Sequence, residues 1–524
     1  MWSARTWHVG GEGPIAAREL FGAAGTPKVV IIGAGFSGIG LAVMLKRVGI
    51  DTFTVYEQAE RVGGAWWHNQ YPGAEVDSVS YIYSYAFRPK AWTRTHARQA
   101  ELQAYLEDTV EHFGIGPHIQ LGVGVVSATW DDCSHTYRVE LTTGERTECH
   151  LLVGATGFLN IPNYPTWPGL EAFRGPKFHT SRWEPEHDLR DKTVAVVGTG
   201  STASQLVPEL AGVVGKLYLF QREPGWIVPK GEFDYSPDQS ARFANPLQLR
   251  LARLKWFYAT EKRLWRANLF RPGTAANEAA RQVALAFIDK ELGDRPDLVK
   301  AVTPDYPYWG KRLIMNSTFY ASLKDPRVEL IPRAVASVTP TGVVDVDGVE
   351  RQIDVLIMAT GFRTTDYLGT FELRGADGRT LNECWGGEPS AFLGMTVPNF
   401  PNFYIMYGPG TNGGEIVSML MRQAEHIVKS AKRMVRHRVT ALEVRPAWAR
   451  MYDAWLSAQV DTTTWAVSHN YYKSSTGKII TQWPYSPGVY GLMVRALGRY
   501  SQRPRATADI SGPGTRRPPP VPAR

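Results

Sequence analysis

Residues 29–45 read VVIIGAGFSGIGLAVML, and this stretch decides the fold. A short apolar run leads directly into GAGFSG, and a helical apolar pattern continues from Ile39 to Arg47. A second β-rich run follows at 51–56 and ends in Glu57. Strand, glycine-rich turn, helix and strand form a βαβ unit of the kind that binds a dinucleotide. The glycines favour this interpretation over a membrane span for the uncharged stretch.

The three glycines of this turn have distinct roles. Gly33 permits the tight turn, Gly35 lets the backbone approach a pyrophosphate, and Gly38 lets the helix pack on the strand. The helix N-terminus favours the phosphate charge. Glu57, nineteen residues after Gly38, can accept hydrogen bonds from ribose hydroxyls and would repel a 2′-phosphate. The first unit is therefore predicted to bind FAD or NAD rather than NADP.

The same succession of elements recurs at 193–222. TVAVV precedes GTGSTA, a helical stretch runs through Leu210, and the next strand ends in Arg222. A cation at that strand end can pair with a 2′-phosphate, which predicts NADP. Glu223 follows directly and opposes this preference, and an ordinary exposed charge is the alternative interpretation of Arg222. The turn residues expected to contact the nucleotide are Gly198, Thr199, Gly200 and Ser201.

ATGF occurs twice, at 155–158 and 359–362, each time after a strand-like run that would close one unit. The predicted fold is α/β, with two Rossmann-like dinucleotide-binding domains and an inserted helical subdomain. The stretch at 235–305, which is rich in Ala, Leu, Arg and Glu, is expected to be helical and is interpreted as a structural cap. We expect a flexible N-terminal arm at 1–26, an FAD-binding domain at 27–160 and 366–500, an NADP-binding domain at 161–234 and 306–365, a helical insertion at 235–305, and a disordered basic tail at 501–524.

Composition narrows the class of protein. The chain has 524 residues, 44% of them hydrophobic and 21% charged, which is typical of a soluble protein of two or three domains. Of its net charge of +8, the tail contributes five Arg against one Asp, and without a basic helix array we expect no nucleic-acid partner. Cys133, Cys149 and Cys384 form no CxxC and no metal-ligand spacing. With no apolar signal-peptide run in the first twenty residues, we expect a cytoplasmic protein without a metal, a redox disulfide or a stable membrane span.

Two further motifs carry a resemblance to a known family. GGAWWHNQYPGAEVD (63–77) and FRGPKFHTSRWE (173–184) resemble the two signatures of type I Baeyer–Villiger monooxygenases, which are class B flavoprotein monooxygenases. The second departs from the family at Glu184, where the family has Pro or Asp. The order of motifs fits from about residue 27 to 485. The matching residues are Gly63, Gly64, Trp66, Tyr71, Pro72, Gly73 and Asp77 in the first signature and Phe173, Gly175, His179 and Trp183 in the second.

The resemblance implies an activity and its cofactors. Members of the family use NADPH to reduce FAD, form a C4a-peroxyflavin with O2, and convert a ketone through a tetrahedral Criegee adduct into an ester or lactone. By resemblance, Arg312 is the catalytic arginine, Asp77 orients it, and Lys311 holds the 2′-phosphate of NADPH. A guanidinium that is always charged can stabilise the anions of such a reaction. An ordinary surface Lys-Arg pair is the alternative.

Other residues carry weaker assignments. Trp66, Tyr83, Val125 and Met419 align with flavin-contacting positions, although core packing explains each equally well. Tyr471 stands where relatives carry a Trp that contacts NADP.

His179 is expected in a flexing linker between the two domains, as a hydrogen-bonded residue that couples domain motion to turnover rather than a proton-transfer group. Three alternatives to ketone oxidation stay open: an N- or S-oxygenase of amines or sulfides, a flavin electron-transfer reductase, and a catalytically silent NADP sensor.

Overall fold

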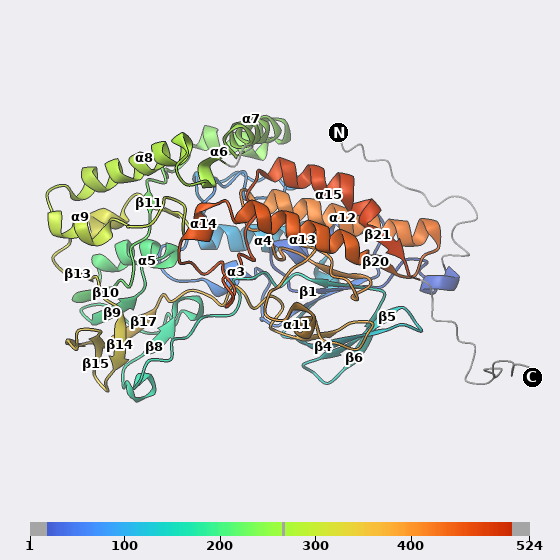
Figure 1. The fold of residues 1–524 in the computed structure, drawn as a ribbon, viewed down its shortest axis with the longest axis horizontal. Coiled ribbons are helices and arrows are strands. Elements are labelled where there is room, and N and C mark those ends of the chain that lie inside the picture. The colour runs from blue at the N-terminus through green and yellow to red at the C-terminus, as the bar shows by residue number, and fades with distance from the viewer. Residues whose placement is uncertain (1–17, 265–267, 506–524) are drawn as a thin grey trace, which may run out of the picture.

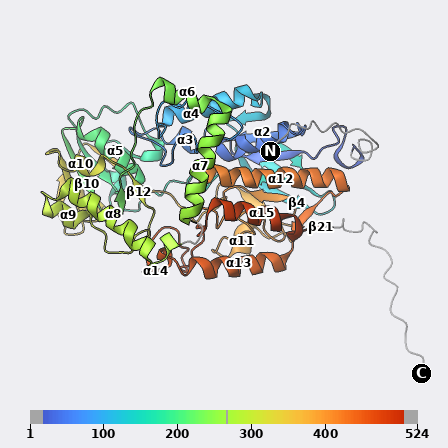
Figure 2. The same ribbon diagram turned by 90° about the horizontal axis from the view of Figure 1, so that it is seen from above.

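The computed structural model describes residues 18–264 and 268–505, which form two α/β halves side by side (Figure 1). A five-stranded parallel sheet lies at the centre of each half. Long helices run along one edge of both halves and across their junction (Figure 2). The fold class predicted from the two glycine-rich turns is therefore confirmed.

The first sheet has the order β19-β7-β1-β2-β3. Its elements are β1 (Val29–Ile32), β2 (Phe53–Glu57), β3 (Ile119–Leu121), β7 (Leu151–Gly154) and β19 (Phe403–Ile405), with helices α2 (Phe36–Lys46), α3 (Ala65–His68), α4 (Gln99–His112) and α12 (Ile416–His437). Val29 and Ile31 belong to the core shared with α2 and α12, whereas Val30 and Ile32 belong to the core on the opposite face. Burial on both faces explains why this strand is continuously apolar.

A mixed four-stranded sheet covers that opposite face, with β18 parallel to its neighbour and the other pairs antiparallel. Its order is β18-β4-β5-β6, from β4 (Val125–Asp131), β5 (Thr136–Leu141), β6 (Arg146–Cys149) and β18 (Glu372–Arg374). Both β18 and β19 come from the chain after residue 366, so this late segment contributes strands to the first half.

The second sheet has the order β13-β10-β9-β17-β8 and repeats the arrangement of the first, except that its edge strand β8 precedes the glycine turn in the chain. Its strands are β8 (Lys177–His179), β9 (Thr193–Val197), β10 (Lys216–Phe220), β13 (Val328–Ile331) and β17 (Val355–Met358), with helices α5 (Ser201–Ala211) and α10 (Phe319–Ser322). In each sheet the strand before the glycine turn lies between its second strand and the returning strand. This arrangement opens a crevice at the carboxyl ends of the strands, where such folds bind nucleotides.

Helices fill most of the expected insertion at 235–305. They are α6 (Pro237–Ala244), α7 (Pro246–Leu264), α8 (Ala275–Leu292) and α9 (Pro296–Val302). The remaining elements are β11 (Ile227–Val228), β12 (Ile314–Met315), β14 (Val335–Val338), β15 (Gly342–Asp345), β16 (Glu350–Gln352), α11 (Leu381–Trp385), β20 (Leu442–Val444), α13 (Pro446–Val460), α14 (Thr464–Val467), α15 (Pro487–Ser501) and β21 (Gln502–Pro504), and the short 3-10 turns η1 (Gly116–His118), η2 (Leu170–Ala172), η3 (Thr180–Arg182) and η4 (Asn268–Phe270).

The two expected mobile ends need correction where the structure describes them. Phe21, inside the expected N-terminal arm, is buried, with its ring 5.2 Å from that of His150. At the other end, β21 pairs with β20, and Arg505 forms an ion pair with Asp132. An apolar ring and a paired cation hold these segments on the body. The rest of the predicted arm and tail, 1–17 and 506–524, lies outside the described residues.

Within the described residues, no helix combines the length and the apolarity that crossing a lipid bilayer requires.

Candidate active site

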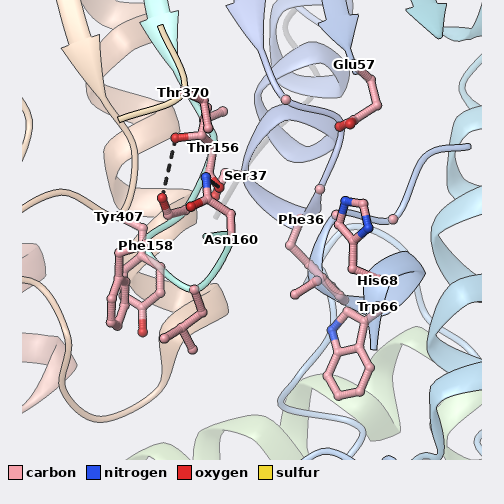
Figure 3. Close-up of a pocket in the computed structure, with 18 of the residues that line it drawn as sticks. Phe36, Ser37, Glu57, Trp66, His68, Thr156, Phe158, Asn160, Thr370 and Tyr407 are labelled. Carbon is pink, nitrogen blue, oxygen red and sulfur yellow. Dashed lines mark hydrogen bonds between the residues drawn. The ribbon is translucent and has the colours of Figure 1, made fainter. Parts of the chain in front are cut away.

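A cavity of about 260 Å³ opens at the carboxyl end of β1. Its walls come from the first glycine turn at 33–38, from the start of the first signature at 63–68, from the ATGF turn at 155–158, and from α12. Figure 3 shows Phe36, Trp66 and His68 on one wall, with Phe158 and Tyr407 across from them. Three residues that line it, Arg182, Arg312 and Phe362, belong to the second half, so the cavity lies at the junction.

The first glycine turn is shaped by close backbone contacts. Gly33 has φ +106°, and a Cβ there would lie 2.8 Å from the carbonyl oxygen of Ala155. A Cβ at Gly38 would lie 1.9 Å from the carbonyl oxygen of Gly33. Helix α2 starts at Gly35 without a side-chain cap, so its first N–H groups stay available to a ligand. These contacts explain why each of the first and third positions needs glycine.

Glu57 ends β2 and lines the same cavity. Its carboxylate is buried and accepts hydrogen bonds from the backbone N–H groups of Ala34 at 2.8 Å and Ala59 at 2.9 Å. These bonds hold the acid beside the glycine turn, and its remaining lone pairs can accept ribose hydroxyls.

The second glycine turn repeats this geometry. Gly198 has φ +114°, and a Cβ there would lie 2.4 Å from the carbonyl oxygen of Ala359, in the second ATGF segment. Gly200 faces open space and begins α5 without a side-chain cap. In each half, the alanine carbonyl that begins the ATGF segment therefore packs directly against the first glycine of the turn. Thr199 is buried, and its hydroxyl donates to the carbonyl of Glu223, while Ser201 opens the helix.

The charges at this second turn are arranged differently from expectation. Arg222 is exposed and forms no ion pair with any residue that the structure describes. Lys311 forms an ion pair with Glu223, and its ammonium lies 4.8 Å from the centroid of the Tyr306 ring. Burial raises the pKa of Glu223, but the hydrogen bond and charge of Lys311 lower it by more. The lysine expected to hold a 2′-phosphate is thus paired with the acid expected to oppose it.

Arg312 lies at the junction end of the cavity. Its Nη2 is 3.0 Å from Oδ2 of Asp77, which belongs to the first signature. Burial is the largest single effect and disfavours the guanidinium charge, but the charge of Asp77, together with Tyr471, Tyr472 and Tyr407, outweighs it and raises the pKa of Arg312. Burial also raises the pKa of Tyr407, against the opposing charge of Arg312. The pair is therefore a permanent cation held beside a carboxylate and facing the cavity.

The rest of the first signature docks onto the second half. Tyr71 donates through its hydroxyl to Oε1 of Gln205 at 2.8 Å, and Gln205 lies in α5, behind the second glycine turn. Gly73 has φ +81°, and a Cβ there would lie 2.5 Å from the Gln205 carbonyl oxygen. Gln205 also donates to the carbonyl of Glu75 at 2.9 Å. The signature is therefore a joint between the two halves as well as a wall of the cavity.

His179 does not lie in a flexing linker, which corrects that expectation. It ends β8, the edge strand of the second sheet, and is fully buried. Its Nε2 donates to the carbonyl of Gly361 at 3.0 Å, and its Nδ1 accepts from the backbone N–H of Ser181 at 3.1 Å. Burial lowers the pKa of His179 to about 4. The imidazole is therefore neutral at pH 7 and secures the second ATGF turn.

Trp183 and Glu184 complete the second signature away from the cavity. The Trp183 ring packs edge-on against Phe178 at 5.2 Å. Glu184, the departure from the family pattern, accepts a hydrogen bond from His187 at 2.9 Å. Glu184, which stands where the family has Pro or Asp, therefore has a local hydrogen-bond partner in His187.

The weaker flavin assignments divide into two groups. Trp66, Tyr83 and Val125 all line the cavity, and the Trp66 indole N–H donates to the Tyr83 hydroxyl at 3.2 Å. Met419 instead lies in the core with Trp483 and the first turns of α13 and α15 nearby, so core packing accounts for its side chain. Helix α12 reaches the cavity through Ile416 and Leu420.

Tyr471 is half-exposed, and its ring lies 4.5 Å from that of Tyr472. Its backbone carbonyl accepts a hydrogen bond from the Thr364 hydroxyl. Burial raises the pKa of Tyr471, while the nearby charge of Arg312 opposes it. The segment after residue 465 therefore approaches the Arg312 end of the cavity.

Several lining residues were not predicted. They come from loops whose course depends on the tertiary fold, although the recurrence of ATGF was a usable signal for one of these loops. His68 is one of them, and burial lowers its pKa to about 4. The unpredicted lining residues include Ser37, His68, Thr156, Asn160, Arg182, Phe362, Thr370 and Tyr407.

Comparison with known proteins agrees with this geometry. Residues 30–255 match the family model described as pyridine nucleotide-disulphide oxidoreductase, although all three cysteines of this chain are unpaired. The chain is 26% identical to the cyclohexanone monooxygenase from Rhodococcus sp. Phi1 bound to NADP+, with a TM-score of 0.82 over 92% of this chain and 99% of that one. It is 33% identical over 485 residues to the FAD-binding monooxygenase ktnD of Aspergillus niger, covering 87% of this chain and 78% of that protein. It is 34% identical over 478 residues to a Baeyer-Villiger monooxygenase of Pseudomonas aeruginosa, covering 90% of this chain and 89% of that protein.

Identity at this level over about nine-tenths of the chain shows that the chain belongs to the Baeyer–Villiger monooxygenase family.

Proposed function

We propose that this chain is an NADPH- and O2-dependent Baeyer–Villiger monooxygenase that uses FAD to convert a small-molecule ketone into an ester or lactone. The observation that carries the proposal is the Asp77–Arg312 ion pair at the junction end of the cavity below the first glycine turn. The free cysteines suit the reducing cytoplasm, where we place the enzyme.

The first half has the features that FAD requires. The backbone at Gly33 and Gly35, with the uncapped start of α2, suits a pyrophosphate, and Glu57 suits a ribose. Trp66, Tyr83 and Tyr407 supply apolar walls with few polar groups for a ring system. Bound FAD, once reduced by NADPH, would supply the chemistry that activates O2. We propose the FAD domain at 27–160 and 366–500.

The second half has the features that NADPH requires. Gly198, Thr199, Gly200 and Ser201 form the phosphate turn. Arg222 follows the end of β10 and Lys311 pairs with the adjacent Glu223, so both cations are available where the ribose 2′-phosphate would lie. We propose the NADP domain at 161–234 and 306–365, with 235–305 as its helical insertion.

Arg312 is the proposed catalytic residue. A guanidinium cannot be deprotonated in the working pH range, so it can stabilise an oxyanion on the ketone carbon throughout turnover. Asp77 fixes the orientation of the Arg312 guanidinium through the 3.0 Å contact, and the other N–H donors of the guanidinium stay available. Its side chain is 45% exposed because it faces the cavity, where a substrate can reach it.

The test is product formation. Purified protein with bound flavin is incubated with NADPH and a panel of ketones, sulfides and amines, and mass spectrometry detects the gain of one oxygen. Arg312→Ala should keep flavin reduction by NADPH and lose ester formation.

Arg374→Ala is the matched control, since Arg374 is 41% exposed and also pairs with one acid, Glu372 at 2.8 Å. Ester yield that survives in Arg312→Ala, or a wild-type protein that oxidises only the sulfide and amine members of the panel, would overturn the proposal.

A further inference from the structure

Helix α7 presents an apolar stripe to solvent. Leu247 is 66% exposed, Leu251 58%, Leu254 56% and Tyr258 73%. Their spacings of four, three and four residues place all four on one face of the helix. Single exposed leucines are ordinary, but a contiguous row of large apolar side chains marks an interaction surface.

The opposite face of α7 holds the helix firmly on the body. Leu249 is buried, and Arg253 donates to the backbone carbonyls of Tyr81 at 2.6 Å and Ser84 at 3.1 Å. Farther along the helix, on the flank that carries Arg250 and not on the opposite face, Glu261 accepts from the backbone N–H of Gly488 at 2.8 Å. These bonds fix the rotation of the helix about its own axis, so the outward stripe follows from a determined orientation.

Cations border the stripe on both sides. At ~100° per residue, Lys255 and Lys262 lie on one flank and Arg250 on the other, and all three are exposed. The acid of this helix, Glu261, is engaged by Ser486 and Gly488. The outer face of α7 is therefore apolar in the middle and positive at its edges.

We propose that this face of α7 docks onto an anionic lipid surface. The four apolar side chains would enter the boundary between headgroups and acyl chains, while the long cationic side chains reach back to lipid phosphates. A second copy of this chain is the less suitable partner, because pairing the two stripes would bring cationic edges against each other. A lipid surface complements both the charge and the apolar row.

The position of α7 in the molecule suits such docking. The helix lies at the upper edge of the molecule (Figure 1) and crosses the junction between the halves when seen from above (Figure 2). The carbonyls that Arg253 binds, of Tyr81 and Ser84, flank Tyr83, which lines the cavity. Docking would thus hold the cavity close to a phase in which apolar ketones concentrate.

The test is vesicle flotation of the full chain. Wild type should float with vesicles that contain phosphatidylglycerol and remain at the bottom with phosphatidylcholine alone. Leu251→Glu with Leu254→Glu should lower the partition coefficient at least about tenfold. Lys255→Glu with Lys262→Glu should lower it by a similar factor on the anionic vesicles. Met451→Glu, at a 60% exposed apolar position of α13, is the control and should float like wild type.

Three results would overturn the proposal: no flotation of wild type, equal flotation of the leucine variant and the control, or a dimer by light scattering that the leucine substitutions dissociate. Because both leucines are exposed, the fold should survive. Leu251→Ser with Leu254→Ser gives a milder version, checked by an unchanged thermal midpoint. The outcome does not depend on ketone oxidation.

Discussion

Glu223→Gln should strengthen NADP+ binding and leave NAD+ binding unchanged. Glu223 directly follows Arg222 at the end of β10 and forms an ion pair with Lys311. In the proposed NADP site, Lys311 must leave this carboxylate to reach a 2′-phosphate. The glutamate therefore competes with the phosphate for the same ammonium group.

The magnitude follows from the exposure of the pair. The two side chains are partly exposed, so the attraction between them is screened by solvent and contributes about 0.5–1 kcal/mol. Removing that competition should tighten NADP+ about two- to fivefold. Because the pKa of Glu223 is lowered, the carboxylate is fully charged at neutral pH, and the effect should stay constant between pH 7 and 8, where the 2′-phosphate is also ionised.

Isothermal titration of NADP+ and NAD+ against wild type and Glu223→Gln measures the effect directly. Asp294→Asn is the matched control, since it removes the acid of another lysine ion pair, at 2.7 Å to Lys324, away from the glycine turn. The gain should shrink as ionic strength rises. Weaker NADP+ binding in Glu223→Gln, or an equal change for NAD+, would show that the acid supports the fold of the turn instead of competing with the phosphate.

The remaining predictions concern the joint, the cation and the buried histidine. Gly73→Ala should lower the thermal midpoint by several degrees more than Gly231→Ala: both have positive φ, costing about 1–2 kcal/mol, but only Gly73 would also strike the Gln205 backbone. Asp77→Asn should reduce the ester formed per NADPH consumed by about tenfold or more, because Arg312 loses its positioning carboxylate, and unchanged coupling would contradict this. His179 has a pKa of about 4 when folded, below its ordinary value, so the unfolded chain binds more protons between pH 4 and 6.5 and stability falls as pH drops through that window. His179→Gln should reduce the slope of unfolding free energy against pH by about 1.4 kcal/mol per unit there, and an equal slope would show that His179 is charged in the fold.

Both glycine turns could be predicted from the sequence because each depends on interactions between residues that are close together in the chain. The strand at 193–197 was predicted with the bounds that β9 has, since a five-residue apolar run before a glycine turn admits few alternatives. The first helix was expected from Ile39 but starts at Phe36, because the glycine-rich turn itself forms the first turn of α2. Boundaries shift where glycines allow the backbone to enter the helix early.

The site was less readable, for a different reason. Asp77 and Arg312 are 235 positions apart, so the periodicity of the sequence cannot predict that they pair. The pair was predicted only from the resemblance to the family. The ion-pair partner of Lys311 was not predicted either, because the sequence does not show which acid lies within reach of a flexible side chain. The outward face of α7 escaped prediction too, because apolar residues occur on more than one face of this helix and the sequence does not say which face packs against the body.

The two signatures share one physical task, which neither nucleotide turn performs. The first docks Gly73 on α5 and places Asp77 beside Arg312, a residue of the second half. The second uses His179 to secure the turn at 359–362, whose Phe362 lines the cavity of the first half. Each signature therefore brings a side chain of the second half to the wall of the cavity in the first half. In the proposed function, hydride transfer and oxygen insertion require that the two nucleotide sites be placed against each other, and we propose that these residues supply that placement.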